Sequence, residues 1–134
     1  MVKVVVVDDS KQFQHSLTRL LSSVQGIAIV GYAEDAASAR RLIDDHRPGI
    51  VVLDVELRDG DRGIDVLPHV VREHPTTKVV ALSSKHWRAL RRAYLKAGAH
   101  VYFDKALEFE QARDWIAACA RSAAAGGDAQ TGNA

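Results

Sequence analysis

Five short apolar runs alternate along the chain with longer amphipathic stretches, and few folds accommodate this pattern. The apolar runs are rich in β-branched residues, and they are Val4–Val7, Ile27–Tyr32, Ile50–Leu53, Val79–Leu82 and Ala99–Phe103. A continuous run of this kind is typical of a strand that is buried on both faces of a parallel sheet. The alternation predicts a doubly wound α/β fold, in which right-handed helical crossovers cover both faces of a five-stranded parallel sheet.

The stretches between these runs carry apolar residues at spacings of three and four, as five amphipathic helices would. We expect the helices at 10–26, 35–48, 66–75, 86–97 and 109–123, the first capped by Asp9 or Ser10 and ended by Gly26. Asp35 should cap the second helix, and Ser83-Ser84 offers a cap for the fourth, which Gly98 closes. The prediction is one domain over residues 1–123, followed by a small, polar, disordered tail at 124–134.

Composition excludes several classes of protein. Of the 134 residues, 47% are hydrophobic and 26% are charged, which indicates a packed core rather than a disordered chain. The formal net charge of +1 gives no general attraction to nucleic acid or to an anionic membrane. The single cysteine, Cys119, cannot form an internal disulfide, and no run approaches the roughly 20 apolar residues of a membrane span. We expect a soluble, cytoplasmic protein.

Polar side chains follow four of the predicted strands. Asp8 and Asp9 come after the first strand, Asp54 after the third, Ser83 after the fourth and Lys105 after the fifth. In an open parallel sheet, the functional crevice lies at the carboxyl ends of the strands, near the point where strand order reverses. These five residues are therefore predicted to share one crevice.

This set of residues has a specific chemical use. Clustered carboxylates repel one another unless a cation neutralises them, and oxygen-only ligands favour magnesium. An aspartate nucleophile, a hydroxyl and a lysine beside such an ion can form an acyl phosphate. Taken singly, Asp8-Asp9 could be a helix-capping pair, Ser83 a cap and Lys105 a solvated lysine; their shared placement weighs against those alternatives.

The sequence resembles the receiver domain of two-component response regulators from Val2 to about Ala123. The matching segments stand in order at the strand ends, and they are Val4–Ser10, Val51–Asp54, Val80–Ser83, Lys96–Ala99 and Tyr102–Lys105. The resemblance implies a flavodoxin-like sheet with strand order 2-1-3-4-5. It also implies that a histidine kinase or phosphotransfer protein supplies the phosphoryl group.

The resemblance further implies a role for each residue of the crevice. Asp54 would accept the phosphoryl group, and Mg²⁺ would be held by Asp8, Asp9, Asp54 and Glu56.

The remaining roles that the resemblance implies belong to the phosphoryl group and the switch. Ser83 would hydrogen-bond one phosphoryl oxygen, Lys105 would pair with another, and Tyr102 would move inward on activation.

The loop Glu56 to Gly63 departs from the family, which usually has a proline soon after the phosphoacceptor. Its conformation is left open by the sequence. Glu56 and Lys85, each two residues after a site residue, carry opposite charges, and we expect them to pair across the mouth of the site if they come within about 4 Å. The alternative is two independently solvated side chains.

The fourth predicted helix carries several cationic residues. Arg88, Arg91 and Arg92 share one of its faces and follow Trp87, so this region is either a solvated face or a surface for a protein partner. The partner would be a downstream target, a second copy of the chain or a kinase. The six histidines are dispersed without metal-ligand spacing, and the sequence assigns them no role.

Three functions fit these observations. The first is a stand-alone receiver, a regulatory phosphoacceptor rather than an enzyme, which signals through protein contacts. The second is an aspartate-nucleophile phosphohydrolase in which Glu56 acts as acid and base, although the chain has no room for the substrate-selecting cap of such enzymes. The third is a degenerate receiver that binds a partner without phosphorylation.

Overall fold

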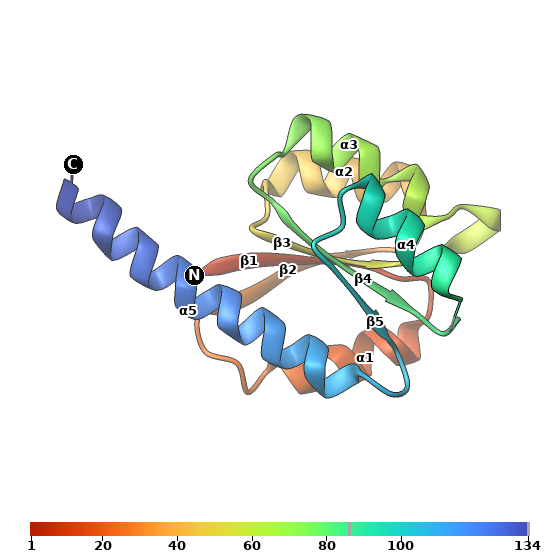
Figure 1. The fold of residues 1–134 in the computed structure, drawn as a ribbon, viewed down its shortest axis with the longest axis horizontal. Coiled ribbons are helices and arrows are strands. Elements are labelled where there is room, and N and C mark those ends of the chain that lie inside the picture. Colours follow the sequence, from red (N-terminus) through yellow and green to blue (C-terminus); the bar gives the residue numbers. More distant parts are fainter. Residues whose placement is uncertain (86, 134) are drawn as a thin grey trace.

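The computed structural model describes residues 1–85 and 87–133, and Figure 1 shows them as one sheet between two layers of helices. The sheet has five parallel strands in the order β2-β1-β3-β4-β5, as predicted. The strands are β1 (Val2–Val7), β2 (Ile27–Ala33), β3 (Ile50–Asp54), β4 (Lys78–Ser83) and β5 (Val101–Asp104). The fold class predicted from the alternating pattern is confirmed.

Helices cover both faces of the sheet. On one face lie α2 (Ala36–His46), α3 (Leu67–Glu73) and α4 (Arg88–Ala97), and on the other lie α1 (Lys11–Leu21) and α5 (Phe109–Asn133) (Figure 1). Two short 3₁₀ turns, η1 (Arg58–Gly60) and η2 (Gly63–Asp65), connect β3 to α3. Crossovers of this kind bring the carboxyl ends of all the strands to one edge of the sheet.

Strand β1 is covered by helices on both faces, which accounts for its apolar residues at successive positions. Val5 and Val7 belong to the core beneath α2, α3 and α4, whereas Val4 and Val6 belong to the core beneath α1 and α5. All four side chains are fully buried. Successive side chains of a strand point to opposite faces, so a strand that is covered on both sides needs apolar residues throughout.

The predicted caps of two helices are confirmed. The Phe13 N–H donates to Ser10 Oγ at 3.2 Å at the start of α1, and the Ser38 N–H donates to Asp35 Oδ1 at 2.8 Å at the start of α2. Gly98 closes α4 in the left-handed region, with φ of 118°.

Helix α1 is shorter than predicted. It ends at Leu21, and Gly26 lies in the turn before β2 with φ of 85°. The hydroxyls of Ser22 and Ser23 donate to the carbonyls of Arg19 and Leu20, so the last turn of the helix is satisfied before the glycine is reached.

The predicted cap of α4 was wrong. The helix begins at Arg88, no side chain caps it, and the predicted start at residue 86 lies outside the described residues. Ser83 Oγ instead accepts a hydrogen bond from the Lys85 N–H at 2.9 Å, which uses this hydroxyl in the turn directly after β4. A serine at the end of a strand stabilises either a turn or a helix start, and the sequence does not distinguish the two.

Helix α5 also differs from the prediction. It was expected to end near Ala123, with a disordered tail at 124–134, but the helical backbone continues to Asn133 and projects beyond the sheet (Figure 1). Alanines at 123, 124 and 125 have high helix propensity and favour this continuation. Residue 134 lies outside the described residues. Within the described part of the chain, no helix is both long and apolar enough to span a membrane.

Candidate functional site

The ends of β1 and β3 bring three carboxylates together. Carboxylate oxygens of Asp8, Asp9 and Asp54 all lie within 4.8 Å of one another. Asp8 and Asp54 are buried, whereas Asp9 is exposed at the mouth of the cluster. Residues 4–7 of β1 pair in register with residues 50–53 of β3, so the residues that follow each strand must meet at the same edge.

Lys105 closes this acidic pocket from the end of β5. Its Nζ donates to Asp8 Oδ2 at 2.7 Å and to Asp54 Oδ2 at 3.0 Å. The ammonium also lies 4.1 Å from the centre of the Phe13 ring. The sequence indicated Phe13 only as an apolar residue of the first helix, and its place one turn after Asp9 was the available signal for a second role. A cation held between two carboxylates and an aromatic face is strongly fixed in position.

The pocket carries an excess of negative charge. Three ionised carboxylates facing one ammonium leave two negative charges unbalanced. Burial, and then the neighbouring Asp8, raise the pKa of Asp54 to about 6, although Lys105 acts in the opposite direction. Burial alone would lower the pKa of Lys105, but Asp54 and Asp8 raise it overall. The protein has assembled charges that repel one another in the absence of a further cation.

These residues fit a hard divalent cation. The donors are all carboxylate oxygens, two from buried side chains and one from the solvent-facing Asp9, which leaves room for water ligands on the open side. A small ion that keeps several waters needs only one or two carboxylates from the protein. The excess of two negative charges matches the charge of such an ion.

The Glu56 carboxylate does not join this cluster among the described residues. Its side chain is 63% exposed, and Oε1 lies 3.6 Å from Lys85 Nζ. The two side chains therefore lie within the predicted distance of each other. The Glu56 N–H instead contributes to the site as a hydrogen-bond donor to Asp54, which lowers the pKa of that carboxyl in part.

Ser83 and Tyr102 form the side of the site that leads to α4. Ser83 is 1% exposed, and Tyr102 is already buried, with its ring 6.0 Å from that of Tyr94. Burial raises the pKa of Tyr102, and the nearby Ser83 hydroxyl offsets part of this effect. The geometry falls short of a hydrogen bond, so the Tyr102 hydroxyl is buried without a well-formed partner among the described residues.

Gly63, which the sequence indicated only as a loop glycine, is a positioning residue. A Cβ at this position would lie 2.5 Å from the backbone oxygen of Asp54, and the Gly63 N–H donates to the Val55 carbonyl at 2.9 Å. The next N–H, that of Ile64, donates to the Tyr94 hydroxyl at 2.8 Å. The loop after β3, whose conformation the sequence left open, thus packs directly against the end of the strand.

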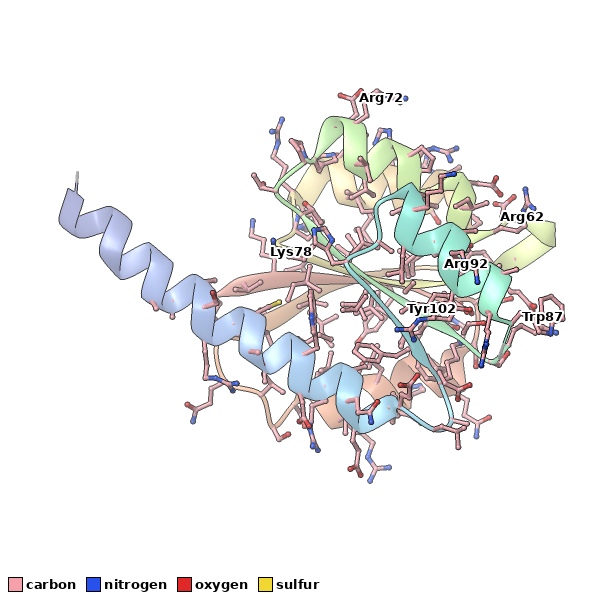
Figure 2. The ribbon with its side chains drawn as sticks, viewed as in Figure 1. Arg62, Arg72, Lys78, Trp87, Arg92 and Tyr102 are labelled. Carbon is pink, nitrogen blue, oxygen red and sulfur yellow. The ribbon has the colours of Figure 1, made fainter. Side chains whose placement is uncertain are left out.

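The cationic residues of α4 form an exposed surface next to the site. Figure 2 shows Trp87 pointing away from the molecule beside the start of α4, and the residue is 63% exposed. A hollow of about 310 Å³ is lined by Arg88, Arg91, Arg92 and Leu95. The Arg91 guanidinium also donates to the Tyr102 carbonyl at 3.3 Å, which ties α4 to β5.

Comparison with known proteins places this geometry in a family. The model of the response regulator receiver domain family matches residues 4–117. The chain belongs to this family. Phosphorylation of an aspartate in two-component signalling and dependence on magnesium are general features of receiver domains.

The receiver domain resembles part of a larger curated protein. It is 31% identical over 105 residues to the response regulator GacA of Pseudomonas syringae pv. syringae (strain B728a). This alignment covers 78% of the chain and 49% of GacA, so the chain spans about half the length of that relative.

Solved structures share the fold of this receiver domain. The response regulator domain of Thermotoga maritima CheB has a TM-score of 0.76 and 25% identity, covering 92% of this chain and 96% of that one. A chain of the CheX-CheY-BeF3-Mg+2 complex from Borrelia burgdorferi has a TM-score of 0.74 and 26% identity, covering 86% and 83%.

Proposed function

We propose that this receiver accepts a phosphoryl group on Asp54 from a histidine kinase or phosphotransfer protein in a Mg²⁺-dependent reaction. The observation that carries the proposal is the buried Asp54 carboxylate at the end of β3, held 3.0 Å from Lys105 beside two further carboxylates. A solvated surface aspartate has no such environment.

The transfer is a substitution at phosphorus. An Asp54 oxygen attacks the phosphorus of an N-phosphohistidine, and the new P–O bond forms as the P–N bond breaks. The leaving imidazole keeps the bonding electrons and takes a proton from solvent. A bound magnesium ion, held by Asp8, Asp9 and Asp54, would supply the positive charge that offsets repulsion between the carboxylates and the phosphoryl oxygens.

Two other residues of the pocket would act on the phosphoryl group. Lys105 would exchange its contact with Asp54 for one with a phosphoryl oxygen and keep its contact with Asp8. Its fixed position between Asp8 and Phe13 favours this exchange. The Ser83 hydroxyl would donate to another oxygen. Because its oxygen already accepts from the Lys85 N–H, the hydroxyl proton remains available as a donor.

The signal would leave through the α4 surface, defined here as Trp87, Arg88, Arg91 and Arg92. Ser83 ends β4, which lies between β3 and β5 in the sheet, and Arg91 of α4 contacts the Tyr102 backbone on β5. The recipient would be a protein, either a downstream target or a second copy of the chain. Action in the cytoplasm remains a prediction of the sequence.

The two alternative functions have less support. In a phosphohydrolase, Glu56 would need to reach the reacting group, but its exposed carboxylate lies beside Lys85 outside the cluster. A receiver that works without phosphorylation has no need of the Asp8, Asp54 and Lys105 arrangement, whose charges are costly to bury.

Intact-mass spectrometry tests the proposal with acetyl phosphate as the donor. The wild-type chain should gain the mass of one phosphoryl group in the presence of magnesium and gain none after chelation. Asp54→Ala should gain none, whereas Asp59→Ala, which changes an exposed loop aspartate, should react like the wild type. Undiminished labelling of Asp54→Ala, or labelling that persists with chelator, would overturn it.

A further inference from the structure

Away from the acidic pocket, two histidines of the α3 region lie within hydrogen-bonding distance of one aspartate of α2. His69 Nε2 lies 2.7 Å from Asp44 Oδ1, and His74 Nε2 lies 2.6 Å from the same oxygen. The ring centres of the two histidines are 5.9 Å apart. The described residues contain only one other group with the same potential to hold a metal ion, the Asp8, Asp9 and Asp54 cluster.

This arrangement could not be predicted from the sequence. Residues five apart on a regular helix point about 140° away from each other, so His69 and His74 have no metal-ligand spacing on a helix. Helix α3 ends at Glu73, and His74 has φ of −134° and ψ of 64°. This break in the helix brings the His74 ring back to the side of α3 that faces Asp44.

The group is at the opposite end of the fold from the phosphoacceptor. Asp44 lies in the last turn of α2, which leads to the start of β3, and His74 precedes the start of β4 at Lys78. Asp54 and Ser83 are at the far ends of these two strands. An ion bound here would therefore be separate from a magnesium ion held in the acidic pocket.

We propose that Asp44, His69 and His74 bind a divalent transition-metal ion, with zinc as the natural candidate. Two imidazole nitrogens and a carboxylate oxygen are the ligands that zinc takes in three-residue sites, with water in the fourth position. The histidine side chains are 19% and 9% exposed, whereas that of Asp44 is 48% exposed. The ligands are thus held by packing on one side and open to water on the other.

Binding requires only a small movement. Ligand atoms about 2.0 to 2.1 Å from a tetrahedral ion are about 3.3 Å apart, which exceeds the present distances of 2.6 and 2.7 Å. The half-exposed Asp44 side chain can supply this opening by a rotamer change on the surface of α2. The ion would replace the two hydrogen bonds that now join α2 to the α3 end, and it would link the same two helices.

Isothermal titration of the full chain with zinc tests the site, in buffer that contains saturating magnesium to occupy the acidic pocket. The protein should carry no histidine tag. We expect one zinc ion per chain, and His69→Gln and His74→Gln should each weaken its binding at least about tenfold. His15→Gln, which changes a histidine of α1 far from this group, and Asp54→Asn should leave zinc binding unchanged.

A second measurement on the wild-type chain covers the case in which a histidine variant fails to fold. Cobalt in place of zinc should give the strong visible absorption of a four-coordinate site, and zinc should raise the thermal midpoint of the wild type by ligand linkage. The proposal would be overturned if the wild type bound no zinc, or if both histidine variants bound zinc as tightly as the wild type. The three side chains would then form only a hydrogen-bonded bridge between the helices.

Discussion

At the scale of single residues, the pocket is built around one lysine that serves two buried carboxylates. Lys105 donates to Asp8 and to Asp54, and Asp9 adds a third negative charge nearby. Removing the Asp54 charge leaves Lys105 paired with Asp8 at 2.7 Å, so no buried cation is left alone. The pocket should therefore tolerate neutralisation of Asp54 better than a simple ion pair would.

This leads to a prediction for the metal-free protein. Asp54→Asn should raise the free energy of unfolding at neutral pH by about 0.5 to 2 kcal/mol, because it removes repulsion and burial of a charge. The folded chain holds the Asp54 proton more tightly than the unfolded chain, since burial and Asp8 raise its pKa from 3.8 to about 6. Ionisation of Asp54 therefore lowers the free energy of unfolding. This destabilisation has its full value above pH 6, decreases as the pH falls through 6, and is absent below about pH 4.

Urea denaturation between pH 4 and pH 8, with chelator present, measures this dependence. The stability advantage of Asp54→Asn over wild type should be largest at the upper end and shrink toward pH 4. Asp59→Asn, at an exposed loop position, serves as the control and should show no such trend. A variant less stable than wild type at pH 7.5, or an advantage independent of pH, would contradict the charge argument.

The Glu56 and Lys85 pair leads to a prediction about the lifetime of the phosphorylated state. The two side chains lie 3.6 Å apart and are 63% and 40% exposed, so their contact contributes little to stability. They lie in the loops that follow Asp54 and Ser83, where they can hinder an attacking water. Glu56→Gln and Lys85→Ala should each speed loss of the phosphoryl group, and the double substitution should add little to either.

Hydrolysis of the phosphorylated chain, followed at fixed magnesium and ionic strength, checks this expectation. Unchanged rates in both single variants would show that the Glu56 and Lys85 pair does not hinder the attacking water. The phosphoacceptor assignment would stand regardless, because it rests on the Asp54 pocket.

At the scale of elements, the strands could be predicted well and the connections could not. Val4 to Val7 are buried on both faces, which is a property of the sequence run itself. The start of α4 depends instead on what Ser83 contacts, and its hydroxyl serves a turn at the end of β4. A local motif such as Ser83-Ser84 allows both outcomes, and tertiary packing selects one.

The loop after β3 is another connection whose conformation the sequence could not predict, and this one affects the functional site. Gly63 has a role only because the loop packs against the Asp54 backbone, and a Cβ there would lie 2.5 Å from the carbonyl oxygen. Gly63→Ala should therefore lower stability by about 1 to 3 kcal/mol and slow phosphorylation, since a backbone atom cannot move aside as a side chain can.

Gly60→Ala is the matched control in the same loop. Gly60 has φ of 80°, but apart from its own and its chain neighbours' atoms, nothing lies within 4 Å of the position that an added methyl carbon would take. Its substitution should cost about 1 kcal/mol through the backbone conformation alone and leave the labelling rate near that of wild type. Equal effects of the two substitutions on labelling would contradict the positioning role of Gly63.

At the scale of the whole molecule, the parallel sheet decides which distant residues meet. The sequence predicted the convergence of Asp8, Asp54 and Lys105 because all three lie at the ends of strands of one sheet. It could not predict the meeting of Asp44 with His69 and His74, since this depends on helix ends and on how α2 packs beside α3. Convergence at strand ends follows from topology, whereas convergence between helices follows from packing.

The layered arrangement also predicts where the signal travels. The α4 surface lies on the side of Ser83 and Tyr102, and Arg91 contacts the Tyr102 carbonyl. Amide-shift mapping before and after phosphorylation should show its largest changes in α4, β5 and the first turns of α5. Helix α2, on the same sheet face but beside β2, serves as the internal control. Changes confined to α2 and α1, with α4 unmoved, would contradict this output route.

In the proposed reaction, the phosphoryl group resides on Asp54. Borohydride reduces an aspartyl phosphate to homoserine, so treating the phosphorylated full chain and mapping its peptides by tandem mass spectrometry locates the acyl phosphate directly. We predict homoserine at position 54 alone, and none when magnesium is removed before labelling. Homoserine at Asp8 or Asp9 in place of Asp54, or a phosphorylated chain that yields no homoserine, would contradict the account.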